Sequence, residues 1–128
     1  MKIFRCFICS IWFSSVADSQ LVSAQVGSTA VLPCEWRNIS VPTPHVQWNT
    51  DTEIVFERKG EQLFEGEGYE NRVDVPQDKL LEGNCSLLLK NVSVTDAGIY
   101  QGHLSVKRMN RASSTKWILV QTLELSVD

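Results

Sequence analysis

Three features that would assign a chemistry are missing from this chain. No stretch after residue 17 approaches the roughly 20 consecutive apolar residues that span a bilayer, and no lipidation signal ends the sequence. Basic residues do not predominate, because 12 Lys and Arg stand against 15 Asp and Glu, and this balance argues against a nucleic-acid partner. No phosphate-binding loop, metal-ligand spacing or nucleophile–base–orienter set occurs. We therefore expect no enzymatic activity, no cofactor and no metal site.

The N-terminus has the pattern of a secretory signal peptide. An apolar run at 3–13 has basic residues at its start, Lys2 and Arg5, and is followed by small residues that mark a cleavage site after Ala17. Cleavage after Ser19 and a membrane anchor are the alternatives, although the run is too short to cross a bilayer. We predict a signal peptide over 1–17 and one domain over 18–128. The domain would be secreted, or held on the extracellular side of the plasma membrane through a segment absent from this chain.

The rest of the chain consists of short alternating segments separated by turns, without the period of a long helix. Trp48 lies 14 residues after Cys34, and the motif Asp96-Ala97-Gly98-Ile99-Tyr100 opens a later strand. These features resemble an immunoglobulin V-type domain, an all-β Greek-key sandwich of two antiparallel sheets. Strands are expected at 20–25, 29–36, 46–49, 54–58, 72–75, 85–90, 99–107 and 123–127, with a flexible stretch around Gly66 and Gly68.

The V-type resemblance implies structural roles for four residues. Trp48 corresponds to the core tryptophan, and Tyr100 to a corner tyrosine whose hydroxyl bonds back to the preceding backbone. V-type domains commonly pair an arginine and an aspartate at the positions of Arg72 and Asp96, closing one end of the sandwich. Breaking such a partly buried pair is costly, because the orphaned charge stays desolvated.

The second cysteine of the usual inter-sheet disulfide is absent. It should come two residues after Tyr100, where this chain has Gly102. Cys85 shares the parity of the two leucines that alternate after it, and so faces the core. Because the strands of Cys34 and Cys85 are antiparallel neighbours in the V-type fold, we predict a Cys34–Cys85 disulfide within one sheet. Two reduced, buried thiols are the alternative, which is uncommon in a small secreted domain.

Two families share further sequence features with this chain. Residues 84–87, followed by the 96–100 motif without a later cysteine, resemble the V-set of sialic-acid-binding immunoglobulin-like lectins, which carry the same intra-sheet disulfide. Residues 27–34, 69–73 and 83–92 are similar to V domains of butyrophilin-like proteins and T-cell costimulatory ligands. The resemblance implies an immune recognition domain that docks through its front sheet.

Sialic acid binding would depend on one arginine. In the lectins, an arginine at the position of His103 grips the sugar carboxylate with its two-pronged guanidinium. A histidine is largely neutral at pH 7 and cannot make that fork. Lys107 and Arg108 could offer point contacts, and Trp117 could stack on the sugar or pack within its own strand. The sequence therefore disfavours a lectin.

The partner-binding surface is expected on the front sheet. We predict a polar surface with an apolar centre, as in transient protein interfaces, and assign it to the outward residues Gln47, Asn49, Phe56, Gln101, His103 and Ser105. The segment 107–116 adds four basic residues and no acids, including Lys107, Arg108 and Arg111. It is either a solvated hairpin tip or a steering element for an acidic partner.

The resulting functional prediction is a non-catalytic domain that binds a protein counter-receptor on immune cells and regulates lymphocyte activation. Homophilic adhesion through the same sheet is the main alternative, and a sialoglycan is a weaker one. Three glycosylation sequons begin at Asn38, Asn84 and Asn91. Disulfide formation at Cys85 competes with glycan transfer to Asn84, so Asn38 and Asn91 are the favoured acceptors.

Overall fold

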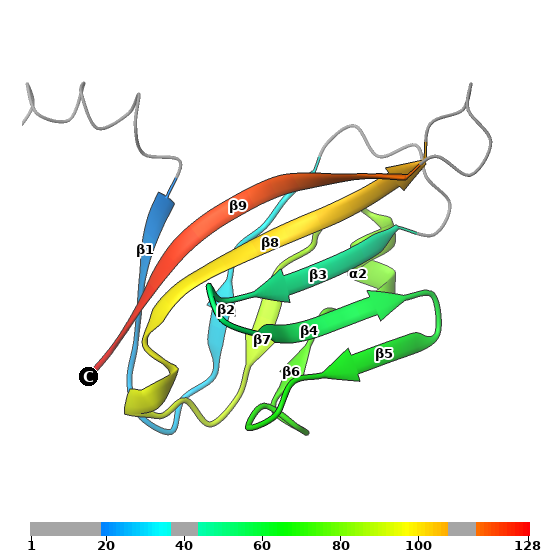
Figure 1. Cartoon of the computed structure of the whole chain (residues 1–128). Coiled ribbons are helices and arrows are strands. Elements are labelled where there is room, and N and C mark those ends of the chain that lie inside the picture. Colours follow the sequence, from blue (N-terminus) through cyan, green and yellow to red (C-terminus); the bar gives the residue numbers. More distant parts are fainter. Residues whose placement is uncertain (1–18, 37–43, 108–114) are drawn as a thin grey trace, which may run out of the picture.

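Nine strands and two short helical turns make up the part of the chain that the computed structural model describes, which is residues 19–36, 44–107 and 115–128 (Figure 1). In chain order they are β1 (Ser19–Ala24), β2 (Ala30–Leu32), β3 (His45–Asn49), β4 (Ile54–Lys59), β5 (Gln62–Glu65), β6 (Val73–Asp74), α2 (Gln77–Leu81), β7 (Leu87–Leu89), the 3-10 turn η1 (Val94–Asp96), β8 (Gly98–Lys107) and β9 (Thr115–Val127).

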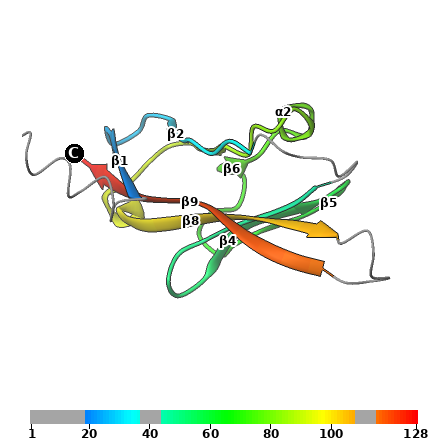
Figure 2. The same cartoon turned by 90° about the horizontal axis from the view of Figure 1, so that it is seen from above.

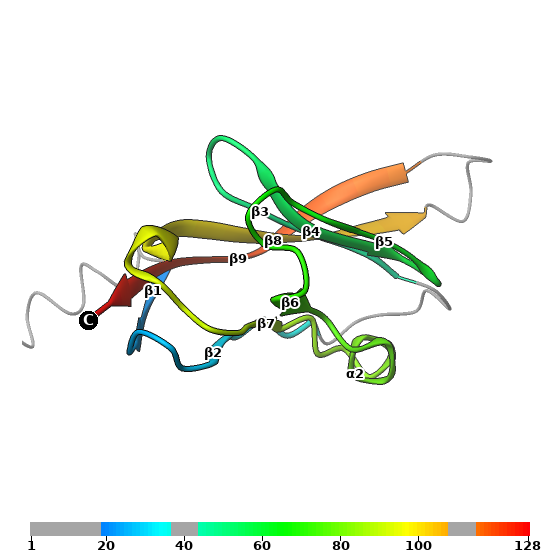
Figure 3. The same ribbon diagram turned by 90° about the horizontal axis from the view of Figure 1, so that it is seen from below.

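The strands form two layers. A six-stranded sheet has the order β1-β9-β8-β3-β4-β5, and a three-stranded sheet has the order β2-β7-β6. Figures 2 and 3 show the two layers from above and below, with α2 on the side of the three-stranded sheet. This confirms the predicted V-type sandwich.

One strand pair differs from the expected purely antiparallel sheets. β1 runs parallel to β9, with Ser19 opposite Thr122 and Ala24 opposite Val127. The backbone N–H of Asp128 continues this pairing by donating to the Ala24 carbonyl over 3.0 Å. The first strand therefore joins the sheet of the last strand, which extends the six-stranded sheet to β1.

The local differences from the sequence expectation are also small. α2 was not expected, because five residues are too few to show a helical period. It begins after Pro76 and anchors itself with the buried Leu80. β5 was not expected and ends just before the Gly66–Gly68 stretch that was expected to be flexible, whereas the strands expected at 29–36 and 85–90 are only three residues long.

The core lies between the layers and follows the alternation of the strands. Trp48 and Tyr100 are 0% and 1% exposed, which confirms their predicted core positions. The indole N–H of Trp48 donates to the Cys85 carbonyl over 2.9 Å, so the tryptophan links the six-stranded sheet to the three-stranded one. A buried polar group with a partner of this kind also fixes the position of the ring.

The predicted disulfide joins Cys34 and Cys85 within the three-stranded sheet. Their Cα atoms are 4.9 Å apart, and the Cys85 N–H donates to the Cys34 carbonyl over 2.9 Å. The same register continues into the isolated bridge between Glu35 and Asn84. The two cysteines are thus cross-strand neighbours, and the prediction is confirmed.

The position of the missing cysteine is filled by Trp48. A Cβ atom added at Gly102 would lie 2.9–3.1 Å from three atoms of the Trp48 ring, closer than carbon atoms normally approach. The indole therefore occupies the space that a side chain on β8 would need. Glycine at position 102 leaves room for the Trp48 ring, and the disulfide joins Cys34 to Cys85 within one sheet instead of using this position.

One end of the sandwich is closed by a hydrogen-bonded ion pair. The Arg72 guanidinium donates to both carboxylate oxygens of Asp96, with a shortest distance of 2.7 Å, and Asp96 is 6% exposed. The Ser93 N–H donates to the same carboxylate over 2.8 Å. The Tyr100 hydroxyl donates to the Asp96 carbonyl and receives a hydrogen bond from Tyr69 over 3.3 Å. Burial raises the pKa of Tyr100.

Candidate recognition surface

The outer face of the six-stranded sheet carries the sequence-predicted binding residues. Strand register arranges its side chains in rows that cross β9, β8, β3, β4 and β5. The middle row consists of Leu119, His103, Gln47, Glu57 and Phe64. The row nearest the β4–β5 turn consists of Trp117, Ser105, His45, Lys59 and Gln62. A third row contains Gln101, Asn49 and Ile54. We call this set the recognition face.

Exposed apolar side chains flank the recognition face on both sides. On β9, Trp117 and Leu119 are 41% and 49% exposed, and on the other side Ile54 and Phe64 are 38% and 52% exposed. The strands between them carry mainly polar side chains. The expectation of an apolar centre is therefore wrong: the centre is polar and the flanks are apolar.

The prediction that Phe56 faces outward is also wrong. The register of β3 and β4 shifts between Trp48 and Asn49, so that Phe56 lies opposite Trp48 and Ile54 lies opposite Asn49. Val55 is the additional residue, and both Val55 and Phe56 are fully buried. A bulge of this kind interrupts the simple alternation from which the outward position of Phe56 was inferred.

The bulge also turns Arg58 inward. Its Nε donates to the Val75 carbonyl and its Nη2 to the Asp74 carboxylate, each over 3.0 Å. Glu57, which was not among the predicted partner-binding residues, takes the outward position instead. An alternating pattern alone gives no signal for such a one-residue shift.

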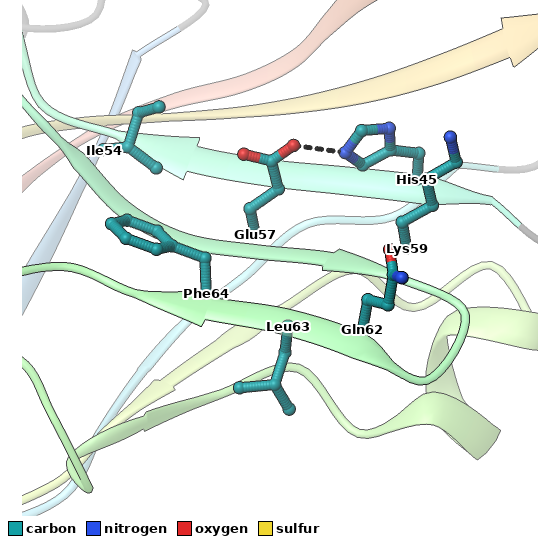
Figure 4. A pocket seen from close by; sticks show the side chains of 7 residues that line it. All are labelled: His45, Ile54, Glu57, Lys59, Gln62, Leu63 and Phe64. Atoms are coloured by element: carbon teal, nitrogen blue, oxygen red, sulfur yellow. Dashed lines mark hydrogen bonds and ion pairs between the residues drawn. The ribbon is translucent and has the colours of Figure 1, made fainter.

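Glu57 contacts two other polar side chains at the centre of the recognition face. Its carboxylate contacts His45 Nε2 at 2.5 Å (Figure 4). It also accepts a hydrogen bond of 3.3 Å from Gln47 Nε2. The His45 ring in turn packs edge-on against Trp117, with ring centroids 4.7 Å apart and an interplanar angle of 64°. These contacts hold His45 between the polar centre and the apolar flank on β9.

His103 lies opposite Gln47 but makes no side-chain hydrogen bond with Gln47, Glu57 or His45. Burial lowers the pKa of His103, so the ring is neutral at pH 7. Its Nδ1 is buried and has no hydrogen-bond partner among the described residues. A neutral, partly covered imidazole cannot hold a carboxylate in the way a guanidinium does.

A shallow groove of about 420 Å³ crosses the β4–β5 side of the recognition face. Figure 4 shows Ile54, Glu57 and His45 along it, with Phe64 on the neighbouring strand. Leu63 lies on the other side of β5 and is 49% exposed, so this edge strand presents apolar surface on both sides.

Comparison with known proteins gives the family. The family model of the immunoglobulin V-set domain matches residues 17–127. The chain belongs to the immunoglobulin V-set family. Programmed cell death 1 ligand 1 of the mouse is 28% identical over 94 residues, which cover 69% of this chain and 32% of that relative. The chain thus spans about a third of that relative's length.

Two solved structures share the fold of this chain. The human B7-H4 IgV-like domain is 25% identical with a TM-score of 0.64, and the alignment covers 84% of this chain and 91% of that one. Murine CRIg has a TM-score of 0.71 at 15% identity, covering 85% of this chain and 92% of that one, and shows the fold alone. The V-set domain described here is thus of the type found in costimulatory ligands, as the sequence resemblance implied.

The remaining predicted site residues of this V-set domain divide into three groups. Gln47, Asn49 and Gln101 are half-buried on the recognition face. Ser105 points to the same side as predicted but is only 7% exposed beside His45 and Trp117, so it offers little surface to a partner. The side chains of Lys107, Arg108 and Arg111, together with Asn38, lie outside the described residues.

The other two sequons lie on the side of the three-stranded sheet. Asn91 is exposed in the turn just after β7, where its backbone has a positive φ of 50°. Asn84 is half-buried, and its Oδ1 accepts a hydrogen bond from the Ser86 N–H over 3.1 Å. Neither sequon is on the recognition face.

Two further features are absent from the described residues, a metal-binding cluster and a membrane-spanning helix. No group of three or more His, Cys, Asp or Glu among them could hold a metal ion. Within the same residues, no helix has the length and hydropathy needed to cross a membrane. V-set domains are recognition modules, and the geometry of this face matches that role.

Proposed function

We propose that this chain is an extracellular recognition domain that binds a protein counter-receptor on immune cells through its recognition face and so regulates lymphocyte activation. The observation that carries the proposal is the pairing of two exposed apolar flanks with a polar centre on one sheet face. Buried apolar contacts supply most of the affinity of protein interfaces, whereas polar groups set the register.

Two further observations support an extracellular setting. The Cys34–Cys85 disulfide is of the kind that persists in oxidising compartments. The sequons at Asn84 and Asn91 lie away from the recognition face, so glycans there would leave it free. With the signal peptide proposed over 1–17, the domain is exported and either secreted or attached through a segment absent from this chain. No nucleic acid takes part.

The likeness to costimulatory ligands supports the choice of partner class. The relatives at 25–28% identity are programmed cell death 1 ligand 1 and the B7-H4 IgV-like domain. We extend this to a counter-receptor on immune cells, although V-set domains serve many specificities and the fold does not choose between them.

Homophilic adhesion is the second candidate. The chain combines the basic segment 107–116 with an acidic segment at 51–70, so a second copy offers complementary charge. Sedimentation at increasing concentration tests this: a dimer that dissociates after Phe64→Ser supports adhesion, and a monomer at all concentrations removes it. A sialoglycan is a weaker candidate, supported only by the exposed ring of Trp117.

The proposal is tested by binding of the tetramerised, secreted chain to leukocytes with and without enzymatic treatment. Binding that survives sialidase and is abolished by protease is the expected result. Binding lost after sialidase would identify a lectin despite His103, and binding that survives protease would contradict a protein counter-receptor.

A further inference from the structure

The acidic residues of this chain concentrate around one flank of the recognition face. Residues 51–70, which include β4, β5 and their turns, contain seven Asp and Glu against two Lys and Arg. All of them lie in the described part of the chain. This gives the β4–β5 flank a net charge of −5 at neutral pH.

Resting on the proposed function, we propose that this flank docks a partner segment in which an apolar side chain is flanked by lysine or arginine. Ile54 and Phe64 would receive the apolar side chain in the groove of about 420 Å³. The surrounding carboxylates would meet the basic residues. The acidic flank is therefore the docking centre, and the basic 107–116 segment is not.

The carboxylates at this flank differ in whether the domain already uses them. Glu65 accepts a hydrogen bond from the Asn71 N–H over 2.7 Å, and Glu70 accepts one from the Gly68 N–H over 3.0 Å. Glu57 is held by His45 and Gln47. These three stabilise the local structure and are not free to reach a partner.

Four other carboxylates are exposed and make no side-chain hydrogen bond or ion pair with another described residue. They are Asp51, Glu53, Glu61 and Glu67. Glu61 lies in the β4–β5 turn, and Glu67 follows β5. Arg58 cannot neutralise them, because it is turned inward to Asp74, which leaves Lys59 as the one outward cation of residues 51–70.

The same charges oppose edge-to-edge pairing of β5 with β5 of a second copy. β5 pairs only with β4 among the described strands, so its other edge is open. Edge-to-edge pairing of two copies would bring their glutamates together, and like charges on edge strands oppose such pairing. A partner with basic residues meets no such repulsion and is drawn to the flank over a distance of about a Debye length, roughly 8 Å at physiological salt.

The test compares variants of the secreted chain for binding to leukocytes at low and high ionic strength. Glu61→Lys/Glu67→Lys reverses two carboxylates that have no structural contact. Glu35→Lys/Glu82→Lys is the matched control, because it changes net charge equally at exposed positions outside the recognition face. Circular dichroism verifies that each variant is folded.

The flank variant is expected to bind about tenfold more weakly and to lose most of its salt dependence. The control should stay within about twofold of the parent chain. Phe64→Ser should also weaken binding by about tenfold or more, as expected for an apolar anchor. Charge reversal that leaves binding unchanged, or strengthens it, overturns the inference.

Leu119→Ser separates this inference from the proposed function. If it abolishes binding while Phe64→Ser and the charge reversal do not, the recognition face stands but the acidic flank is not its docking centre. If none of the variants alters binding, both proposals are contradicted. A short peptide with phenylalanine between two arginines supplies a defined probe: it should shift the NMR signals of Ile54 and Phe64, whereas equal shifts from a glutamate-flanked peptide would contradict the charge preference.

Discussion

Replacing Gly102 by alanine tests the packing that substitutes for the missing inter-sheet disulfide. The new methyl group would lie 2.9 Å from Cζ2, 3.0 Å from Cε2 and 3.1 Å from Cη2 of Trp48. The ring is fully buried and its N–H is bonded to the Cys85 carbonyl. It therefore cannot move away without straining its neighbours or lengthening that hydrogen bond.

The expected magnitude follows from three contributions. Overpacking by one methyl group costs roughly 1–3 kcal/mol, and weakening the Trp48–Cys85 hydrogen bond costs about 1 kcal/mol. Against this, alanine stabilises by about 0.4–1 kcal/mol, because it restricts the unfolded chain and Gly102 does not need a positive φ. We expect Gly102→Ala to lower the free energy of unfolding by about 2 kcal/mol, or to lower Tm by roughly 8 °C.

Urea denaturation followed by circular dichroism measures this difference. The control is a double-mutant cycle with Trp48→Phe, because the smaller ring leaves room for the methyl group. In that background, Gly102→Ala should be neutral or slightly stabilising. An alanine variant as stable as the parent, or equal losses in both backgrounds, would refute the assignment of this space to Trp48.

Three further predictions concern stability. Cys34→Ser should lower the free energy of unfolding by about 4 kcal/mol, since the disulfide closes a loop with a sequence separation of 51 residues, and urea denaturation measures the loss. Asp96→Asn should cost about 3–5 kcal/mol because it removes a carboxylate that is only 7% exposed and that neutralises the partly buried Arg72. Asp74 is 42% exposed, so water already screens its pairing with Arg58, and Asp74→Asn should cost less than Asp96→Asn in the same assay. His103 has a lowered pKa in the folded state, so the unfolded chain binds more protons as the pH falls through about 6.5. Stability should therefore decrease on acidification below that pH, and His103→Gln should reduce the slope of Tm against pH.

Each of these has an outcome that would contradict it. Two alkylatable thiols in the intact mass of the folded parent chain would remove the disulfide. Equal losses for the two aspartate variants would show that burial of the Asp96 carboxylate is not decisive. An unchanged pH slope in His103→Gln would mean that this imidazole is not the group that destabilises the domain on acidification.

The sandwich fold and the Cys34–Cys85 disulfide could be predicted because they depend on local patterns. Alternation places Cys34, Trp48 and Cys85 inward, and the 96–100 motif identifies the strand that should carry the second cysteine. Once the fold is V-type, adjacency of the two cysteine strands follows. These conclusions need only the strand period and the order of the strands.

The recognition face was less predictable because it depends on register across strands. A one-residue bulge in β4 buries Phe56 and exposes Glu57, and no composition signal marks it. The contribution of Phe64 was missed because no strand was expected at 62–65. Exposure also depends on neighbours, as Ser105 shows: it points outward but is covered.

The central claim is that the recognition face binds the counter-receptor, and paired surface variants test it most directly. Leu119→Ser/Phe64→Ser removes two half-exposed apolar side chains from that face. Val31→Ser/Val94→Ser removes two side chains of similar exposure elsewhere, at 51% and 63%. With both variants folded, leukocyte binding should fall at least about tenfold for the first and stay within about twofold for the second. Equal binding by the two variants, or a greater loss for the second, would contradict recognition through the six-stranded sheet.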